Sequence, residues 1–466
     1  MAALRIGDEP LTPAAVAAAA RSGPVEVELT AAARERIAAA RAAADAAAAR
    51  RQVYGRTTGV GANRDTAVQV GGREHALALL RSHAGGLGAP LPAEAVRAAL
   101  LIRLNQMAAG GGGHRPELAD ALVALLQGES LPVLRDLGGI GTGDLTVLAQ
   151  LGLALERSGL ELAEGDALPL ISSNAVTLGV AALALADLRE LLEAGLGVSA
   201  ATFRALDGNR EAFAEAVAAA RPHPGLLAVT RTLWMLTAGA GPPARLQDPF
   251  GLRCLPPVAG ALHGALDALY DVVRVEIGAA AANPLFADGD AWHHGGFHAA
   301  PIALALDAAG LALVPYAQLS TTRLGHLMEP RLTGLAPFLA TGPAGSSGLM
   351  IAEYVAADAL ARLRAEAAPA VTGTAVISRG LEDHASFAWQ AALQARRSVE
   401  HLGMVLALEL AAAQRALALR DVAPPAALEG VLVAEAPAPV DVPIDADVGR
   451  ARALLPRLAA AVRAAR

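Results

Sequence analysis

The sequence has little of what defines several common protein classes. Its 466 residues include one cysteine, Cys254, which excludes a disulfide framework within the chain and is typical of a reducing compartment. The first ten residues carry Arg5, Asp8 and Glu9 and lack the apolar core of a secretion signal. We therefore expect a cytoplasmic protein.

The sequence also lacks an excess of positive charge and a clean membrane-spanning run. The formal net charge is −7, so neither nucleic acid nor an anionic membrane surface is an expected partner. The most apolar stretches, such as 145–155 and 175–188, are short or interrupted by charges, and a span needs about 20 residues. Mean hydropathy is nevertheless +0.40, which predicts helices buried in a large core or between subunits.

What the chain does contain favours helices. Hydrophobic residues make up 54% of the chain but aromatic residues only 3%, and alanine and leucine dominate with few β-branched runs. The length allows two or three domains. We expect an N-terminal helical part over 1–195, a bundle of long helices over 196–422, and a C-terminal loop with a short helix over 423–466.

Four glycines lie within six residues at 138–143, between two segments with helical spacing. Each glycine inside a helix costs about 1 kcal/mol relative to alanine, so the stretch is expected to form a constrained turn. A glycine-rich helix connection without a catalytic role is the alternative interpretation.

Residues 141–149 have the sequence Gly-Thr-Gly-Asp-Leu-Thr-Val-Leu-Ala. This run resembles the Ala-Ser-Gly-Asp-Leu-Ala-Pro-Leu-Ala signature of the histidine and aromatic amino acid ammonia-lyase family. In that family the tripeptide cyclises and loses two waters, which forms the electrophile methylidene-imidazolone. The resemblance makes Gly141, Thr142 and Gly143 catalytic candidates, with Gly141 in place of alanine and Thr142 in place of the dehydrating serine.

A second motif follows the helical segment at 31–51. Residues 54–61, Tyr-Gly-Arg-Thr-Thr-Gly-Val-Gly, resemble the family's Tyr-Gly-x-x-Thr-Gly-Phe-Gly loop, in which the tyrosine is the proposed catalytic base. The resemblance therefore makes Tyr54 a catalytic candidate. A phenol has a pKa near 10, so base catalysis at neutral pH needs a positive or hydrogen-bonding neighbourhood that lowers this pKa.

The most specific motif lies at 247–254, Gln-Asp-Pro-Phe-Gly-Leu-Arg-Cys. Six of its eight positions agree with the family's Gln-Asp-x-Tyr-Ser-Leu-Arg-Cys. The resemblance places Arg253 where the family binds the substrate carboxylate, for which a planar guanidinium is well suited. Phe250 stands in place of the family tyrosine and lacks its hydroxyl.

Two further residues match positions that face the substrate ring in the family. His83 lies in Ser-His-Ala-Gly-Gly at 82–86, where histidine-type members also carry Ser-His. Glu382 lies in Leu-Glu-Asp-His-Ala-Ser at 381–386, and it aligns with the glutamate that faces the imidazole in histidine-type members. A lone histidine at a helix end or a lone glutamate on a helix is more often structural or solvated.

Several positions depart from the family pattern at the methylidene-imidazolone end of the pocket. Ser172 and Gly296 replace two asparagines, and Leu381 replaces a glutamine. Asn174 lies two residues after Ser172, where it is either a displaced substitute or a helix N-cap. The three histidines at 293, 294 and 298 fit no standard zinc signature, so we expect no metal site.

The resemblance extends over about residues 50–420, with the motifs in the family's order. It implies a mainly α fold with a long central helical bundle, similar to the fumarase and aspartase architecture. It also implies a homotetramer in which each active site draws on three subunits. The expected ligand is a small carboxylate or amino acid.

Three functional hypotheses stay open. The first is an ammonia-lyase or aminomutase acting on histidine or a related amino acid with a ring formed from 141–143. The second is an enzyme that uses the same pocket without that ring, for elimination, addition or cyclisation. The third is a non-catalytic binding homologue. Dehydration of Thr142 gives an ethylidene ring whose extra methyl hinders amine addition, so we expect no cofactor and disfavour cyclisation.

Overall fold

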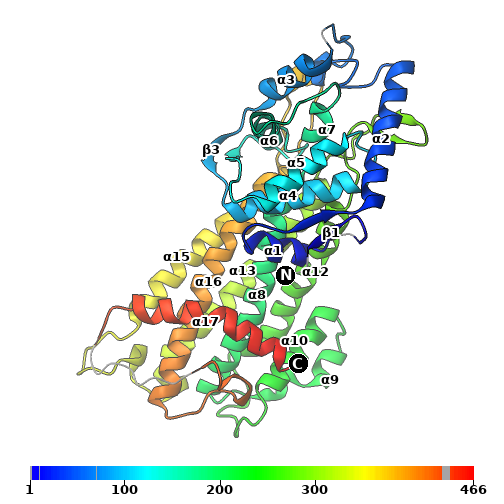
Figure 1. Cartoon of the computed structure of the whole chain (residues 1–466). Helices are drawn as coiled ribbons and strands as arrows, with labels where there is room; N and C mark the ends of the chain where they lie inside the picture. The colour runs from blue at the N-terminus through cyan, green and yellow to red at the C-terminus, as the bar shows by residue number, and fades with distance from the viewer. Residues whose placement is uncertain (1–2, 10, 70, 433–440) are drawn as a thin grey trace. The chain divides into compact units, whose positions relative to one another are not determined.

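We describe the fold from a computed structural model that covers residues 3–9, 11–69, 71–432 and 441–466. The described chain consists mainly of α-helices, which confirms the predicted fold class, and its strands are short. Figure 1 labels many of these elements along the chain. Part of the predicted C-terminal loop, residues 433–440, lies outside the described residues.

The chain divides into two compact units, each assembled from three segments. The first unit contains residues 1–186, 269–307 and 369–393, and the second contains residues 187–268, 308–368 and 394–466. These units do not follow the consecutive parts expected from the sequence, because α8, α12, α13 and α16 each contribute residues to both units.

The first unit holds the N-terminal helices and all of the strands of the described chain. Its complete elements are β1 (Leu4–Ile6), α1 (Pro13–Arg21), β2 (Val27–Leu29), α2 (Ala31–Arg50), η1 (Gly61–Asn63), α3 (Gly72–His83), β3 (Leu87–Pro90), α4 (Ala93–Ala108), α5 (Pro116–Gln127), β4 (Arg135–Leu137), α6 (Leu145–Arg157), α7 (Ala167–Ile171), β5 (Leu285–Ala287), β6 (Asp290–Trp292), η4 (Ala370–Thr372) and η5 (Ser378–Gly380).

In the second unit, the regular elements of the described residues are all helices, joined by loops. Its complete elements are η2 (Arg210–Phe213), α9 (Glu215–Ala219), α10 (Pro224–Leu236), α11 (Phe250–Arg253), α14 (Pro330–Thr333), η3 (Pro337–Leu339), α15 (Met350–Glu366), η6 (Ala426–Leu428) and α17 (Asp445–Ala464). The four shared helices are α8 (Ala175–Ala205), α12 (Leu255–Ile277), α13 (Ala300–Met328) and α16 (Ala388–Leu419).

Local sequence explains where the first helices begin. Thr12 and Thr30 precede α1 and α2, and their side chains accept hydrogen bonds from the amides of Ala15 and Ala33. Such caps satisfy amides that have no partner inside the helix. Pro116 opens α5, where its missing N–H costs nothing.

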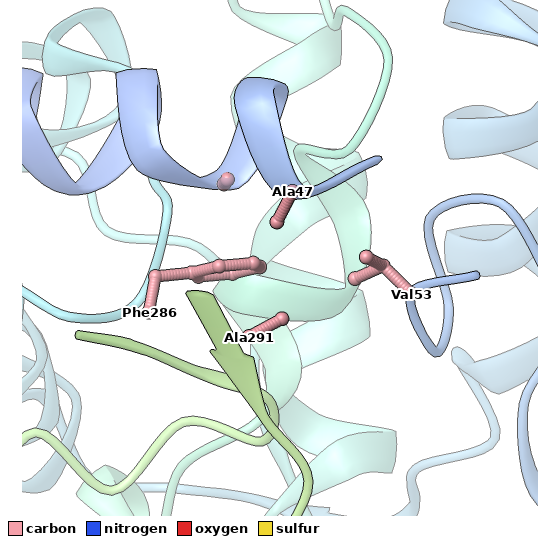
Figure 2. Packing of buried hydrophobic residues seen from close by; sticks show 5 residues of the cluster. Ala47, Val53, Phe286 and Ala291 are labelled. Atoms are coloured by element: carbon pink, nitrogen blue, oxygen red, sulfur yellow. The ribbon is translucent and has the colours of Figure 1, made fainter. Parts of the chain in front are cut away.

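A small apolar cluster fixes the end of α2 against the β5–β6 hairpin. Phe286 packs among Ala47, Val53 and Ala291, as Figure 2 shows, and Ala44 completes the buried group. In the hairpin Phe286 pairs with Ala291 in antiparallel register. Because Val53 directly precedes Tyr54, this packing sets the starting point of the tyrosine loop.

Three segments reach the length and apolar composition of a membrane span: Ala167–Ala205, Ala300–Met328 and Ala388–Leu419. The expectation that no stretch reaches that length was therefore wrong by this criterion. The most apolar window of the first segment is 100% buried inside the chain, and those of the other two are 56% and 72% buried. Burial in a helical core accounts for such apolar helices, as the high mean hydropathy predicts.

Candidate active site

The glycine-rich stretch forms a turn in the first unit, between β4 and α6. Gly141 has φ of 79° and Gly143 has φ of 97°, in the left-handed region that side chains disfavour. Thr142 lies between them and is half-buried. The predicted constrained turn is confirmed, although β4 rather than a helix leads into it.

Hydrogen bonds from two distant segments hold this turn. The Gly141 carbonyl oxygen accepts from the Ser386 hydroxyl at 2.7 Å and from the Ala299 amide at 3.1 Å. The Ile140 carbonyl accepts from the Phe387 amide at 2.9 Å. Three motifs that are far apart in sequence therefore meet at one place. Ser386 lies inside a motif quoted from the sequence, but sequence reasoning gave it no role.

Packing leaves no room for a side chain at position 141. A Cβ built on Gly141 would lie 2.1 Å from the Ser386 Oγ and 2.7 Å from the Ala388 nitrogen. The alanine of the family signature would therefore clash in this conformation. Both the left-handed φ and the lack of space for a Cβ therefore require glycine at position 141.

Asn174, two residues after Ser172, is hydrogen-bonded to the glycine turn. The Asn174 Oδ1 accepts from the Gly143 amide at 3.0 Å, and its Nδ2 donates to the Phe297 carbonyl at 2.7 Å. Ser172 is buried, and its hydroxyl accepts from the Asn283 amide at 3.0 Å. The structure thus favours Asn174 as the displaced substitute, while Ser172 has a structural contact and its substrate role stays a prediction.

Asp144 supplies the helix cap that Asn174 does not. Its carboxylate accepts from the amides of Val176 and Thr177, each at 2.8 Å, and from the Thr177 hydroxyl at 2.7 Å. Burial raises the pKa of Asp144 to about 6, against the opposing effect of these hydrogen bonds. This residue joins the start of α6 to the start of α8 and so keeps the turn next to Asn174.

The tyrosine loop lies against the hairpin and η5. The Tyr54 amide donates to the His293 Nε2 at 3.2 Å, and the Tyr54 hydroxyl accepts from the Gly61 amide at 2.7 Å. Burial raises the pKa of Tyr54, more than the Gly61 hydrogen bond lowers it. The neighbourhood that a phenolate base needs is therefore absent around Tyr54 in the described chain.

Glu382 lies close to the same loop, a proximity that the sequence did not predict. A Cβ on Gly61 would lie 3.2 Å from the Glu382 Oε1, and the Ser378 hydroxyl accepts from the Ala62 amide at 2.9 Å. The negative charge of Glu382 also contributes to the raised pKa of Tyr54. The structure therefore brings Tyr54 and Glu382 together at Gly61. Leu381 is solvent-exposed beside them.

His83 ends α3 close to the beginning of α6. Its Nδ1 lies 2.9 Å from the Leu79 carbonyl oxygen and 3.0 Å from the Ser82 hydroxyl oxygen. Two residues on, a Cβ at Gly85 would lie 3.8 Å from the Thr146 side chain, in the first turn of α6. The segment that directly follows His83 therefore lies against the first turn of α6.

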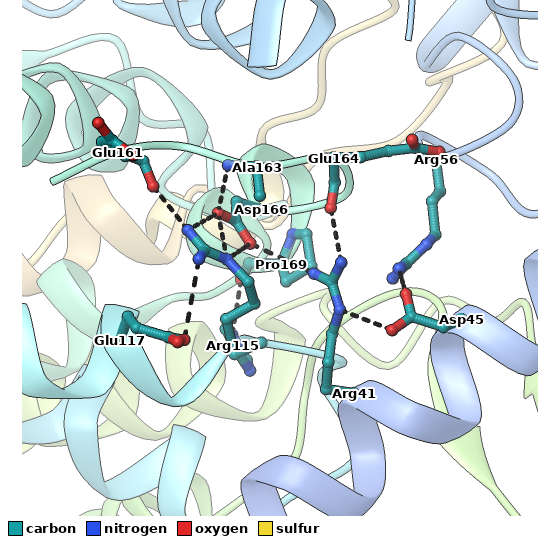
Figure 3. Close-up of polar contacts among 11 residues, drawn as sticks. Arg41, Asp45, Arg56, Arg115, Glu117, Glu161, Ala163, Glu164, Asp166 and Pro169 are labelled. Carbon is teal, nitrogen blue, oxygen red and sulfur yellow. Dashed lines mark hydrogen bonds and ion pairs between the residues drawn. The ribbon is translucent and has the colours of Figure 1, made fainter. Parts of the chain in front are cut away.

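A polar network that the sequence did not predict links α2, the tyrosine loop and the segment before α7 (Figure 3). Asp166 is fully buried and binds Arg115 at 2.7 Å and Arg41 at 3.3 Å. It directly precedes α7, which leads to Asn174. Arg56, within the tyrosine loop, pairs with Asp45, which in turn binds Arg41 at 3.1 Å. These arginines are scattered along the sequence, so no local motif indicated the network.

A hollow of about 550 Å³ lies beside the tyrosine loop. Residues of the 59–69 segment and of α3 line it, including Glu74 and His75. None of the predicted site residues is among its lining residues. The candidate site of the first unit is therefore described by its contacts rather than by this hollow.

The histidines near the hairpin have structural partners. The His294 Nδ1 accepts from the Gly296 amide at 2.8 Å, and its Nε2 lies 3.1 Å from the Ala282 carbonyl. Gly296 is exposed, and it has no side chain to offer a ligand. Within the described ranges, no group of three or more histidine, cysteine, aspartate or glutamate residues is arranged to hold a metal ion.

Arg253 and Phe250 lie on α11 in the second unit. The Arg253 guanidinium carbon is 4.5 Å from the centre of the Phe250 ring, a cation–π contact. The Arg253 Nε is buried and has no hydrogen-bond partner among the described residues. Phe250 is 63% exposed, so the pair borders solvent.

A buried ion pair fixes α11 from within the second unit. Arg323 binds Glu409 through its Nε at 2.6 Å and its Nη2 at 2.8 Å, and its Nη1 donates to the Gly251 carbonyl at 3.0 Å. Glu409 also accepts from the hydroxyls of Thr202 and Ser320, at 2.7 Å and 2.6 Å. The charges of Arg323 and Glu409 thus compensate each other, and the Nη1 hydrogen bond of Arg323 holds the backbone carbonyl two residues before Arg253.

Comparison with known proteins agrees with this arrangement. The model of the aromatic amino acid lyase family matches residues 11–436. The histidine ammonia-lyase of Streptomyces coelicolor is 35% identical and covers 98% of this chain and 95% of its own.

Solved structures show the same fold. The histidine ammonia-lyase of Trypanosoma cruzi has a TM-score of 0.89 at 25% identity, covering 99% of this chain and 95% of its own. The tyrosine aminomutase of Streptomyces globisporus also has a TM-score of 0.89 at 25% identity, covering 99% and 98%.

The chain belongs to the aromatic amino acid lyase family. It is a carbon–nitrogen lyase-family enzyme with the helical ammonia-lyase fold.

Proposed function

We propose that the chain is an ammonia-lyase that acts on histidine or a closely related amino acid, with the Gly-Thr-Gly turn retained as an open peptide. The matching relative named histidine ammonia-lyase, 35% identical, supports the substrate class. The hydrogen bonds at the turn are the observation that supports the open peptide. Elimination breaks the Cβ–H and Cα–N bonds, forms a Cα=Cβ double bond and releases ammonia.

The residues present do not fit the methylidene-imidazolone ring. Ring formation needs the Gly143 nitrogen to attack the Gly141 carbonyl carbon, but the Gly143 N–H is bound to the Asn174 Oδ1. The Gly141 carbonyl is held separately by Ser386 and Ala299. A ring from Thr142 would also carry an extra methyl on its reactive carbon. We therefore derive no step through this group.

Arg253 is the proposed carboxylate anchor. Its buried Nε without a protein partner and its solvent-bordering position suit a planar, bidentate contact to a carboxylate. We propose that the chain forms a homotetramer, as the resemblance implies, in which Arg253 of another copy completes the site. The single cysteine supports the proposal that this tetramer is cytoplasmic.

His83 and Glu382 are the proposed ring contacts. An imidazole side chain such as that of His83 can donate to or accept from a polar substrate ring. The sequence contains no lysine, so no lysine amine can transfer the proton in this site. With its pKa raised, Tyr54 stays a neutral phenol at pH 7, which suits a hydrogen-bond donor to substrate.

Ammonia release tests this function. The purified protein is incubated with histidine, tyrosine and phenylalanine, while ammonia and the α,β-unsaturated acid are quantified. We expect turnover with histidine above the other two. The variant Arg253→Gln should raise KM by about tenfold or more, because the carboxylate contact is charge-assisted. Tight binding of histidine without product would instead indicate the non-catalytic homologue.

A further inference from the structure

One segment of the first unit reaches both parts of the candidate site. At residue 378 it meets the tyrosine loop, where the Ser378 hydroxyl oxygen accepts from the Ala62 amide at 2.9 Å. At residue 386 it meets the glycine turn, where the Ser386 hydroxyl donates to the Gly141 carbonyl at 2.7 Å. We call residues 378–386 the bridging segment. Its two terminal serines connect the tyrosine loop to the glycine turn through hydrogen bonds.

The backbone at both ends of the bridging segment has an unfavourable conformation. Ser378 and Arg379 have φ of 52° and 56°, and Phe387, directly after the segment, has φ of 52°. Residues with a Cβ disfavour this left-handed region and keep it only where surrounding contacts enforce it. Contacts with the two loops do so here, because Ser378 binds the Ala62 amide and the Phe387 amide donates to the Ile140 carbonyl at 2.9 Å. The strain at both ends thus accompanies the attachment to the loops.

The amide that Ser378 binds is next to the amide that binds Tyr54. The Gly61 amide donates to the Tyr54 hydroxyl oxygen at 2.7 Å, and the Ala62 amide donates to the Ser378 hydroxyl oxygen. Ser378 also packs against the first of these residues, since a Cβ at Gly61 would lie 2.6 Å from the Ser378 Oγ. The contacts of Ser378 therefore fix the direction of the Gly61 N–H, and with it the position of the phenol oxygen.

The Gly61 hydrogen bond leaves the hydroxyl hydrogen of Tyr54 available to a ligand. A phenol has one hydrogen to donate, and this hydrogen points away from the amide that already occupies a lone pair of its oxygen. Over the ranges that the structure describes, no side chain or carbonyl accepts the Tyr54 hydrogen. The charged groups that act on the same hydroxyl are Glu382, which raises its pKa, and Arg64, which lowers it.

We propose that Ser378 is a positioning residue for Tyr54. By binding the Ala62 amide, Ser378 holds the Gly61 N–H on the phenol oxygen and so directs the phenol hydroxyl toward the substrate. The bridging segment keeps this hydroxyl in a fixed position relative to the glycine turn, because Ser386 at its other end binds Gly141. This inference rests on the proposed function and deepens it. Ser378 acts through Tyr54 and takes no part in the bond changes.

A double-mutant cycle tests whether Ser378 acts through Tyr54. Steady-state kcat and KM for histidine are compared for the wild type, Ser378→Ala, Tyr54→Phe and the double variant. Misplacement of a reacting group by about 1 Å costs up to about 100-fold, so Ser378→Ala should lower kcat by about 10- to 100-fold with KM within about threefold. In the Tyr54→Phe background the same change should cost nothing further, because the hydroxyl that it positions is gone. An equal loss of kcat in both backgrounds overturns the proposal.

Two glycine variants separate positioning from folding. Ser378→Gly removes the hydroxyl but relieves the left-handed strain, so it should be at least as stable as Ser378→Ala in thermal unfolding and lose the same share of kcat. Arg379→Gly relieves the same strain one residue further on and leaves the Ser378 hydroxyl in place, so it should keep the kcat of the wild type. Wild-type kcat in Ser378→Gly would overturn the proposal.

A readout without turnover separates this proposal from the proposed function. The ¹³Cζ resonance of Tyr54, assigned by its loss in Tyr54→Phe, is titrated with pH in the wild type, Ser378→Ala and Arg379→Gly. The Gly61 hydrogen bond lowers the pKa of Tyr54, so Ser378→Ala should raise this pKa and Arg379→Gly should leave it unchanged. If the wild type releases no ammonia but Ser378→Ala raises the pKa, the proposed function fails and Ser378 still positions Tyr54. If neither turnover nor this change is found, both are overturned.

Discussion

Replacing Gly141 by alanine tests the geometry of the turn directly. The change restores the first residue of the family signature, but here it places a Cβ 2.1 Å from the Ser386 Oγ at a φ of 79°. A left-handed alanine costs about 1–2 kcal/mol, and overpacking adds about 1–3 kcal/mol. We therefore expect Gly141→Ala to lower the stability of the first unit by about 2–5 kcal/mol.

A second glycine provides a matched control. Gly289 has nearly the same φ, 77°, but a Cβ there meets nothing within 4 Å. Gly289→Ala should cost only the backbone term, about 1–2 kcal/mol. The difference between the two variants isolates the clash at the turn. Adding Ser386→Gly to Gly141→Ala should recover part of that difference, because the nearest atom is then gone.

Urea unfolding followed by tryptophan fluorescence measures these changes where they occur. Trp389 is buried beside the turn, and its Nε1 donates to the Asp136 carbonyl at 2.7 Å. Trp234 and Trp292 are replaced by phenylalanine in every protein compared, so that the signal comes from Trp389. Equal stability of Gly141→Ala and Gly289→Ala would refute the packing described at the turn.

Three further predictions concern the supports of the site. Asn174→Ala leaves the buried Gly143 amide unpaired and should cost about 1–3 kcal/mol in urea unfolding with a fall in kcat, whereas Ser172→Ala should leave kcat within threefold. The pKa of Asp144 is about 6 in the folded state, above the unfolded value of 3.8, so the protonated carboxyl stabilises the fold below pH 4. This stabilisation is lost as the pH rises to 6, and the wild type should lose on the order of 2–3 kcal/mol relative to Asp144→Asn over that range. Parallel curves of stability against pH for the two proteins would contradict this. Glu409→Gln leaves Arg323 buried and uncompensated, so it should cost about 3–5 kcal/mol of stability and weaken carboxylate binding in calorimetry, and unchanged affinity would show that the pair does not position Arg253.

Much of the fold and the site could be predicted because the motifs are local. The glycine turn, the tyrosine loop and the Arg253 motif each carry their signal within about eight residues. Composition alone indicated helices, since alanine and leucine have high helix propensity. The approach of Glu382 to the tyrosine loop was not predicted from the sequence, which paired Glu382 with His83, and the roles of Tyr54 and Glu382 stay predictions.

The remaining features depend on contacts between residues far apart in the sequence. Ser386 and Ala299 bind Gly141 from segments more than 150 residues away, and no local pattern indicates that these segments meet the turn. Asn174 binds the turn because the fold places the Gly143 amide next to its side chain, and the Asp144 carboxylate caps the start of α8 instead. The raised pKa of Tyr54 follows from burial, which only the folded chain defines.

The division into two units was also beyond local signals. Its boundaries fall within long helices that have no break in composition at those points. The predicted domain boundaries lie between motifs, whereas compact units are defined by dense contacts among residues that can be far apart in the sequence.

The mass of the peptide that contains the turn tests the central claim most directly. Trypsin cleaves after Arg135 and Arg157, so residues 136–157 form one peptide that includes Gly141, Thr142 and Gly143. An open turn predicts the full, unmodified mass of this peptide in a preparation that releases ammonia from histidine. A deficit of two water molecules would show that Thr142 has formed the ring and would contradict the account.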